Sequence, residues 1–338
     1  MKIFNPIQIK KVLFKNRIVM APMVPFGLPL PTDGIMDDEL LAHYSQRAPN
    51  GMGLIISQSL SVTSKKMLAG GLGVYSDSHL AYLQKLVKSC HSHGTKFFAQ
   101  LAYPSASYPN DDSISHFSEK EMEEIKDEFI KAALVCKEAG CDGIELHGAH
   151  GFFLNMVMSP LANKRKDQFG SSFKGRLKLI KNIVDGIKAF TDDNFIISYR
   201  MGWNNTLALD IQTAQALESI GIDLLHISFG IPSDRNLQIP PNLPFNQTLY
   251  TGTQIKKHIQ IPMIVVNDIR TLNQGNELLE DNLCDFVAYG KPFLADAAFL
   301  TKSLTNYDYK PCFGCKTCGW FVSGKTCPAQ NHLLLHEK

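Results

Sequence analysis

This 338-residue sequence lacks the features that would indicate a membrane or nucleic-acid ligand. No apolar run approaches the ~18 residues of a membrane-spanning helix. The first residues, MKIFNPIQIKK, contain no apolar segment typical of a secretory signal. The 34 basic residues nearly balance the 32 acidic ones, which gives a net charge of +2. Nucleic-acid binding needs a concentrated basic face. We therefore expect a cytoplasmic protein that binds neither nucleic acid nor membranes.

A glycine-rich GxGxxG turn is also missing after the first apolar run, which argues against a Rossmann domain. Short apolar or β-branched runs instead alternate with longer amphipathic stretches, the pattern of a parallel α/β sheet. The runs are Ile18–Met23, Leu54–Ser59, Phe97–Leu101, Gly143–Leu146, Phe195–Arg200, Leu224–Ser228, Met263–Val266 and Phe286–Tyr289. Eight of them favour a closed (β/α)8 TIM barrel over residues 1–305, followed by a Cys-rich tail over residues 306–338.

Helix and hairpin signals support this order of elements. Ser118 and Glu121 form a capping box ahead of a helix predicted over 122–139. Residues 2–14 resemble a small hairpin or plug ahead of the first barrel strand. The Pro-, Gly- and Asn-rich segments 24–34 and 230–245 follow strands and predict loops on the active-site face that influence substrate choice.

The eight cysteines divide into two sets. Four are scattered through strand and helix patterns and are expected to be small buried hydrophobic residues: Cys90, Cys136, Cys141 and Cys284. Four crowd the tail with C-x2-C-x2-C-x8-C spacing: Cys312, Cys315, Cys318 and Cys327. Without a signal segment a disulfide framework is not expected, so the clustered set predicts a metal site. The spacing favours a 4Fe–4S cluster, with zinc or free thiols as alternatives.

The stretch from Cys141 to Gly170, CDGIELHGAHGFFLNMVMSPLANKRKDQFG, contains the strongest functional signal. It places His147 and His150 just past the end of a predicted buried strand. Catalytic groups of parallel α/β barrels come from the loops that follow the strands. The alternative is that both histidines are hydrogen-bonded core residues.

This stretch resembles the pattern EIHGAHGYLLxQFLSPxxNxRxDxYGG of the Old Yellow Enzyme family of FMN-dependent ene reductases. The resemblance implies FMN at the C-terminal face of the barrel and NAD(P)H as electron donor. It also implies a small-molecule substrate with an activated C=C bond, an enone or enoate. His147 and His150 would hydrogen-bond the substrate oxygen, so that hydride from the flavin adds to the polarised alkene.

The resemblance also assigns residues to the flavin ring at three strand ends. The Ala-Pro-Met segment would touch the flavin through its backbone, and the next residue stands where many members have Thr or Cys. A Gln would bond the pyrimidine edge, and an Arg would face N1. These positions are Ala21, Pro22, Met23, Val24, Gln100 and Arg200. Independently of the family, an arginine inside a barrel needs an anion, for which a carboxylate such as Glu145 is the alternative.

The phosphate of FMN is expected at the loops after the seventh and eighth strands, where this fold often binds phosphate. Asn267 and Asp268 would supply backbone amides in the first loop, and Gly290 with Lys291 the contacts in the second. The family usually has Arg at the last position. Lys291 can still bind phosphate but lacks the bidentate fork. Lys291 is also the candidate for a Schiff-base lysine in a competing aldolase interpretation, which its Gly-Lys placement does not favour.

The proton donor is altered. The family tyrosine is Phe152 here, which cannot donate a proton. Tyr103, after the third strand, is predicted to be the acid, and Tyr108 or water is the weaker alternative.

The cysteine run and the preceding KPFLADA resemble those of 2,4-dienoyl-CoA reductase and trimethylamine dehydrogenase, which hold a cluster just after the barrel. A cluster here would pass electrons between FMN and a partner protein, as in an amine-dehydrogenase-like enzyme. Without it, NAD(P)H would reduce FMN directly. A rival interpretation from another class is a non-catalytic barrel whose zinc-binding tail recognises a macromolecule. A homo-oligomer is compatible with all of these.

Overall fold

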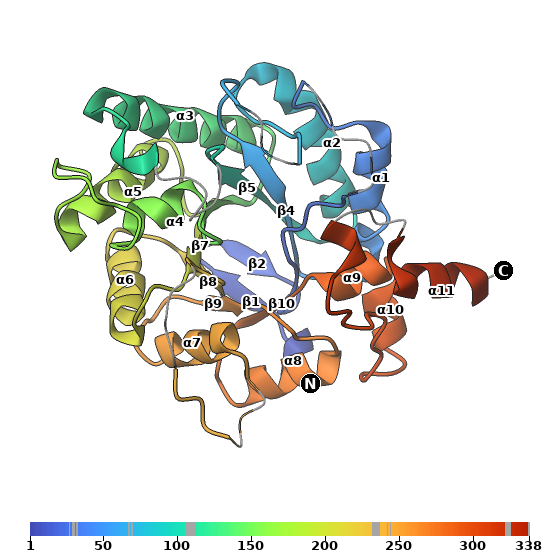
Figure 1. Cartoon of the computed structure of the whole chain (residues 1–338). Coiled ribbons are helices and arrows are strands. Elements are labelled where there is room, and N and C mark those ends of the chain that lie inside the picture. Colours follow the sequence, from blue (N-terminus) through green and yellow to red (C-terminus); the bar gives the residue numbers. More distant parts are fainter. Residues whose placement is uncertain are drawn as a thin grey trace.

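Eight parallel strands form a closed barrel in the order β10-β3-β4-β5-β6-β7-β8-β9 (Figure 1). The computed structural model describes residues 1–26, 28, 31, 33–66, 68, 70–105, 113–231, 237–241, 243, 245–321 and 326–336. The barrel strands are β3 (Ile18–Met20), β4 (Leu54–Ser61), β5 (Lys96–Ala102), β6 (Gly143–Gly148), β7 (Ile196–Gly202), β8 (Leu224–Ser228), β9 (Met263–Val265) and β10 (Phe286–Tyr289). Every predicted apolar run is therefore a barrel strand, and the predicted (β/α)8 TIM barrel is confirmed.

Helices surround the barrel (Figure 1). They are α1 (Asp38–Ser45), α2 (Leu80–His91), α3 (Glu119–Glu138), α4 (Phe153–Met158), α5 (Phe173–Lys188), α6 (Leu207–Ser219), α7 (Gln247–Lys256), α8 (Leu272–Glu280), α9 (Lys291–Ala295), α10 (Phe299–Ser303) and α11 (Pro328–His336). The capping box of α3 is present, because Glu121 N donates to Ser118 Oγ at 3.2 Å and Ser118 N donates to the Glu121 carboxylate at 2.7 Å. Across the described ranges, none of these helices has the length and apolar character needed to cross a membrane.

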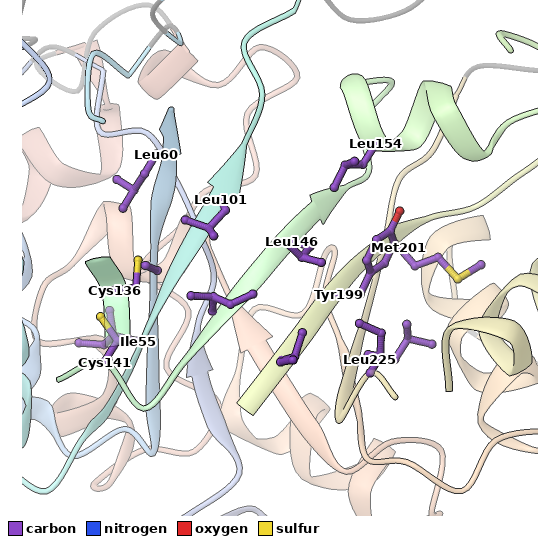
Figure 2. Packing of buried hydrophobic residues seen from close by; sticks show 14 of the residues in the cluster. Ile55, Leu60, Leu101, Cys136, Cys141, Leu146, Leu154, Tyr199, Met201 and Leu225 are labelled. Carbon is purple, nitrogen blue, oxygen red and sulfur yellow. The ribbon is translucent and has the colours of Figure 1, made fainter. Parts of the chain in front are cut away.

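The main core lies between the strands and the helices. Figure 2 shows part of this layer, where Leu101 from β5, Leu146 from β6 and Leu225 from β8 are among the packed side chains. Cys136 and Cys141 lie in the same layer. The four scattered cysteines are all buried, which confirms that they act as small hydrophobic residues.

The strands β1 (Ile7–Ile9) and β2 (Val12–Phe14) form an antiparallel hairpin that covers the N-terminal end of the barrel. This is the hairpin predicted within residues 2–14. The Phe14 ring packs edge-on against Phe98 at 6.1 Å and Phe286 at 5.2 Å between centroids. This end of the barrel interior is therefore filled by apolar side chains.

Further along the strands the interior becomes polar. Side chains alternate between the two faces of a strand, so every second residue of a barrel strand points into the barrel. On β7 this series is Ile196, Ser198 and Arg200, and on β8 it is Leu224, His226 and Ser228. The inward positions near the C-terminal ends of the strands are thus charged or polar, and the site is expected there.

Candidate functional site

A cavity of about 800 Å³ opens among the C-terminal ends of the strands. Its wall contains every residue that the sequence assigned to the flavin, together with both histidines: Ala21, Pro22, Met23, Val24, Gln100, His147, His150, Arg200, Asn267, Asp268, Gly290 and Lys291. These residues come from strands and loops that are far apart in the sequence. The barrel therefore brings the whole predicted constellation to one place.

The two histidines are neighbours on the cavity wall. Their ring centroids lie 5.1 Å apart with the planes at 87°. His147 is not past the strand end, as predicted, but within β6, where it pairs in register with Arg200 of β7. His150 does follow the strand. Its backbone has φ of +61°, a strained conformation for a non-glycine residue, and its N–H donates to Phe229 O at 2.8 Å.

Both imidazoles are neutral at physiological pH. Burial, followed by the charge of Arg200, lowers the pKa of His147 to about 3. The same two causes lower the pKa of His150 well below its ordinary value. A neutral imidazole donates one hydrogen bond and accepts another, so each histidine can offer one N–H to an oxygen in the cavity.

Arg200 is linked to His150 through Ser228. The Arg200 Nη2 group donates to Ser228 Oγ at 3.1 Å, and Ser228 Oγ lies 2.8 Å from His150 Nε2. Burial lowers the pKa of Arg200 to about 10, so the guanidinium stays charged at neutral pH. Ser228 was not singled out from the sequence, although it is the last residue of a correctly predicted strand.

A carboxylate lies below this layer. Glu145 is fully buried and accepts a hydrogen bond from Gln100 Nε2 at 2.8 Å, and its other oxygen lies 2.8 Å from His226 Nδ1. Burial alone would raise the pKa of Glu145, but His226, Arg200 and Gln100 outweigh it and the pKa is lowered. The alternative partner considered for Arg200 therefore makes its direct contacts with His226 and Gln100, while its charge still acts on Arg200.

The opposite end of the cavity has the predicted phosphate residues. Asn267 and Asp268 have φ of +98° and +60°, a sharp turn of the kind in which successive backbone amides can face an anion. The Asp268 carboxylate accepts a hydrogen bond from Arg270 Nε at 2.7 Å, and Arg270 also lines the cavity. Gly290 and Lys291 stand at the start of α9. Arg270 was missed because its side chain reaches the cavity only through the turn.

The predicted acid does not reach the site. Among the described residues the cavity wall includes Phe152, whose ring lies 5.1 Å from His147, but not Tyr103. Tyr103 follows directly after β5, which ends at Ala102. The Tyr103 ring packs 4.8 Å from Phe153, and burial raises its pKa. Tyr108 lies outside the described residues.

The structure does not show the metal site predicted for the cysteine tail. Its four cysteines line one small pocket of about 20 Å³, but no three His, Cys, Asp or Glu side chains in the described ranges form a group that could hold a metal ion. Cys327 is buried, Cys312 and Cys318 are partly buried, and Cys315 is exposed. The arrangement therefore does not fit a cluster or zinc as it stands.

The tail nevertheless contributes to the main cavity. Trp320 and Phe321 line it, and Trp320 packs in a small apolar cluster with Leu294 and Ala295 of α9. Lys291 and Trp320 line both the main cavity and the cysteine pocket. In Figure 1 the tail lies beside α9 and α10. The sequence predicted the tail as a separate site and gave no sign of this contact.

The cavity fits a flavin mononucleotide on its own chemistry. Its volume is in the range of cofactor pockets, roughly 300–1,000 Å³. Arg200 Nε and His147 Nδ1 are buried without a partner among the described residues, so polar groups remain available for a ligand. A side chain at Gly290 would meet Met23 Sδ at 3.1 Å, and the glycine thus leaves room in the wall.

Comparison with known proteins places the chain among flavin enzymes. Residues 2–116 and 111–308 match the model of the NADH:flavin oxidoreductase / NADH oxidase family. The chain is 32% identical to an NADH oxidase of Thermoanaerobacter brockii over 343 residues, which are 93% of this chain and 52% of that protein. It is 30% identical to an NADPH dehydrogenase of Bacillus velezensis over 318 residues, covering 88% of this chain and 93% of the relative.

Solved structures share the fold. A 2-naphthoyl-CoA reductase in complex with 2-naphthoyl-CoA superposes with a TM-score of 0.81 at 21% identity, covering 95% of this chain and 56% of that one. An Old Yellow Enzyme homologue from Zymomonas mobilis superposes with a TM-score of 0.74 at 20% identity, covering 95% and 99%. The chain thus spans about half the length of the Thermoanaerobacter brockii enzyme and of the naphthoyl-CoA reductase.

Proposed function

This chain belongs to the NADH:flavin oxidoreductase / NADH oxidase family, the family of Old Yellow Enzyme, and from this premise we propose that it is an FMN-dependent ene reductase. Its substrate in this proposal is a small molecule with a C=C bond activated by a neighbouring carbonyl, an enone or enoate. NAD(P)H is the electron donor. Bound FMN, once reduced, supplies the hydride.

The observation that carries the proposal is the pair of neutral imidazoles beside a buried cation. His147 and His150 share one wall of the cavity, and their lowered pKa values leave each with one N–H to donate. A substrate oxygen that gains negative charge during hydride addition is stabilised by such preorganised donors. Donors of this kind accelerate the reaction because they bind the developing charge more tightly than the neutral carbonyl.

The other lining residues would hold the cofactor. Arg200 supplies a fixed positive charge next to the histidines, which suits the electron-rich edge of a reduced flavin. The amide N–H of Gln100 donates to Glu145, so the amide oxygen of Gln100 is left to accept a hydrogen bond from the flavin ring. At the far end the turn at Asn267 and Asp268 and the cation of Lys291 suit the phosphate.

The proton for the α-carbon has no phenolic donor on the described wall, because Phe152 occupies the family position and Tyr103 packs elsewhere. We assign this step to water that enters the open cavity. Hydride transfer and proton transfer are then separate steps, and only the first depends on the histidine pair.

The test uses protein loaded with FMN and reduced anaerobically with NADPH or NADH. It is mixed with a cyclic enone, and reoxidation is followed by flavin absorbance. Replacing both His147 and His150 by Ala should slow reoxidation by about 100-fold, as removal of an oxyanion donor does, while FMN stays bound. The matched control is Ser198→Ala, another buried polar residue of the barrel interior that does not line the cavity. Failure to bind FMN, or an unchanged rate in the double variant, would refute the proposal.

The alternative, in which electrons leave through a 4Fe–4S cluster to a partner protein, is supported only by the cysteine spacing and by the residues shared between the two pockets. The described cysteines do not form a group that could hold a metal ion, so we derive no electron-transfer step through one. Iron, sulfide and zinc analysis after anaerobic purification decides between the two. About four irons per chain would favour the alternative, and metal-free protein would favour direct reduction by NAD(P)H.

A further inference from the structure

Ser228 lies between Arg200, which can only donate hydrogen bonds, and His150, whose ring nitrogens can donate or accept them. The guanidinium of Arg200 has donors and no acceptor. Its Nη2 donates to Ser228 Oγ at 3.1 Å, and on the other side Ser228 Oγ is 2.8 Å from His150 Nε2. Ser228 has a relative exposure of 4%, so water has little access to its hydroxyl group.

The hydroxyl hydrogen of Ser228 needs an acceptor. Since Arg200 occupies one lone pair of Ser228 Oγ, two arrangements remain. In the first, Ser228 donates to an unprotonated His150 Nε2. In the second, a protonated Nε2 donates to Ser228, and the hydroxyl hydrogen is left without an acceptor among the described residues. A buried donor left unsatisfied costs about 1–3 kcal/mol, so the first arrangement is favoured.

The charge of Arg200 acts in the same direction. A cation bound to the hydroxyl oxygen polarises the O–H bond and strengthens it as a donor. It also disfavours a second positive charge on the nearby imidazole, in keeping with the lowered pKa of His150. A neutral imidazole that accepts at Nε2 must have its proton on Nδ1.

We propose that Ser228 is a positioning residue that fixes His150 as its Nδ1–H tautomer. His150 then presents a single N–H, at Nδ1, to an oxygen bound in the cavity. Ser228 also lines the cavity, but in this role it acts through the histidine, while Arg200 orients the serine. The tautomer follows from the geometry of these three side chains alone, whereas its use in catalysis rests on the proposed function.

The direct test is nitrogen-15 NMR of the full chain, because the shifts of the two ring nitrogens of a neutral histidine distinguish protonated from unprotonated nitrogen. The His150 signals are identified by their loss in His150→Asn. We expect Nδ1 protonated and Nε2 unprotonated at neutral pH. Ser228→Ala should move both signals toward a mixture of tautomers, and Ser228→Thr, which keeps the hydroxyl, should restore them. Ser198→Ala, which removes a buried hydroxyl that has no partner among the described residues, should leave them unchanged.

A wild-type spectrum with Nε2 protonated, or with both nitrogens protonated, overturns the proposal. So does a Ser228→Ala spectrum identical to wild type. None of these readings depends on turnover, so the tautomer can be refuted while the ene-reductase proposal stands, and the reverse. In the enzyme assay, Ser228→Ala should slow enone-dependent reoxidation about 10-fold, at the low end for loss of a group that orients a catalytic ligand, and Ser228→Thr should recover most of the rate.

Discussion

Replacing Glu145 by Gln should destabilise the protein strongly although the substitution changes hardly any volume. The carboxylate is fully buried. One oxygen accepts a hydrogen bond from Gln100 Nε2, and the other lies 2.8 Å from His226 Nδ1. It also offsets the buried charge of Arg200. A glutamine would point an amide N–H at one of these donors and would leave the guanidinium without its nearby negative charge.

The magnitude follows from the loss of a buried charge partner. Breaking a buried ion pair by removing one member costs about 3–5 kcal/mol. The lower end applies, because the amide oxygen of the substituted side chain would still accept one of the two hydrogen bonds and His226 can shift its proton. We therefore expect the free energy of unfolding to fall by roughly 3 kcal/mol at pH 7.

The effect has a defined pH dependence. Because folding lowers the pKa of Glu145, its ionisation stabilises the folded chain above the unfolded-state pKa of about 4.3. That contribution is lost as the pH falls through the still lower folded-state pKa. The difference between wild type and Glu145→Gln should thus be largest near neutral pH and should shrink below about pH 4.3.

Urea unfolding monitored by circular dichroism, with equal slopes for the two proteins, measures the change. The control is Ser198→Ala, since Ser198 is the register neighbour of Glu145 on β7, is equally buried and has no hydrogen-bond partner among the described residues. It should cost less than about 1 kcal/mol. A Glu145→Gln variant as stable as Ser198→Ala at pH 7, or a difference that grows in acid, would refute the reasoning.

Three further predictions concern the cavity. Phe152→Tyr adds an acid to the wall and should speed steady-state enone reduction about 100-fold, the lower end for general acid catalysis; an unchanged turnover would show that proton transfer is not limiting. Lys66 lines the cavity with no ion-pair partner among the described residues, whereas Lys65 pairs with Glu128 at 3.2 Å. In steady-state kinetics, Lys66→Ala should therefore raise the KM for an enoate about 5-fold and leave the KM for a neutral enone unchanged, and Lys65→Ala should change neither value. The 5-fold factor corresponds to about 1 kcal/mol, the energy of a screened charge pair. Because the pKa of His147 is about 3, the reoxidation rate should show no titration of this residue between about pH 5 and 8; an inflection there that disappears in His147→Ala would contradict the neutral donor.

Much of the fold was predictable because each barrel strand is a short apolar run between amphipathic stretches. The Gly143–Leu146 run and the two histidines after it predicted the end of the barrel at which the cavity opens. Alternation along the strands could also have found Glu145 and Ser228, since both occupy inward positions next to another polar inward residue, His147 on β6 and His226 on β8.

The remaining parts of the site depend on tertiary contacts that sequence spacing does not encode. Trp320 and Phe321 line the cavity, and the tail is held there by the packing of Trp320 on Leu294 and Ala295 of α9. Arg270 arrives through a turn with two successive positive φ angles. The cysteine spacing predicted four ligands around one metal, but spacing alone does not set how the side chains converge.

The central claim is that the cavity at the strand ends holds FMN, and a crystal structure of the FMN-loaded protein tests it most directly. We expect one FMN per chain, with the ring against Ala21–Val24 and Arg200 and the phosphate between the turn at Asn267 and the start of α9. FMN bound elsewhere, or a cavity that stays empty at saturating FMN, would contradict the claim.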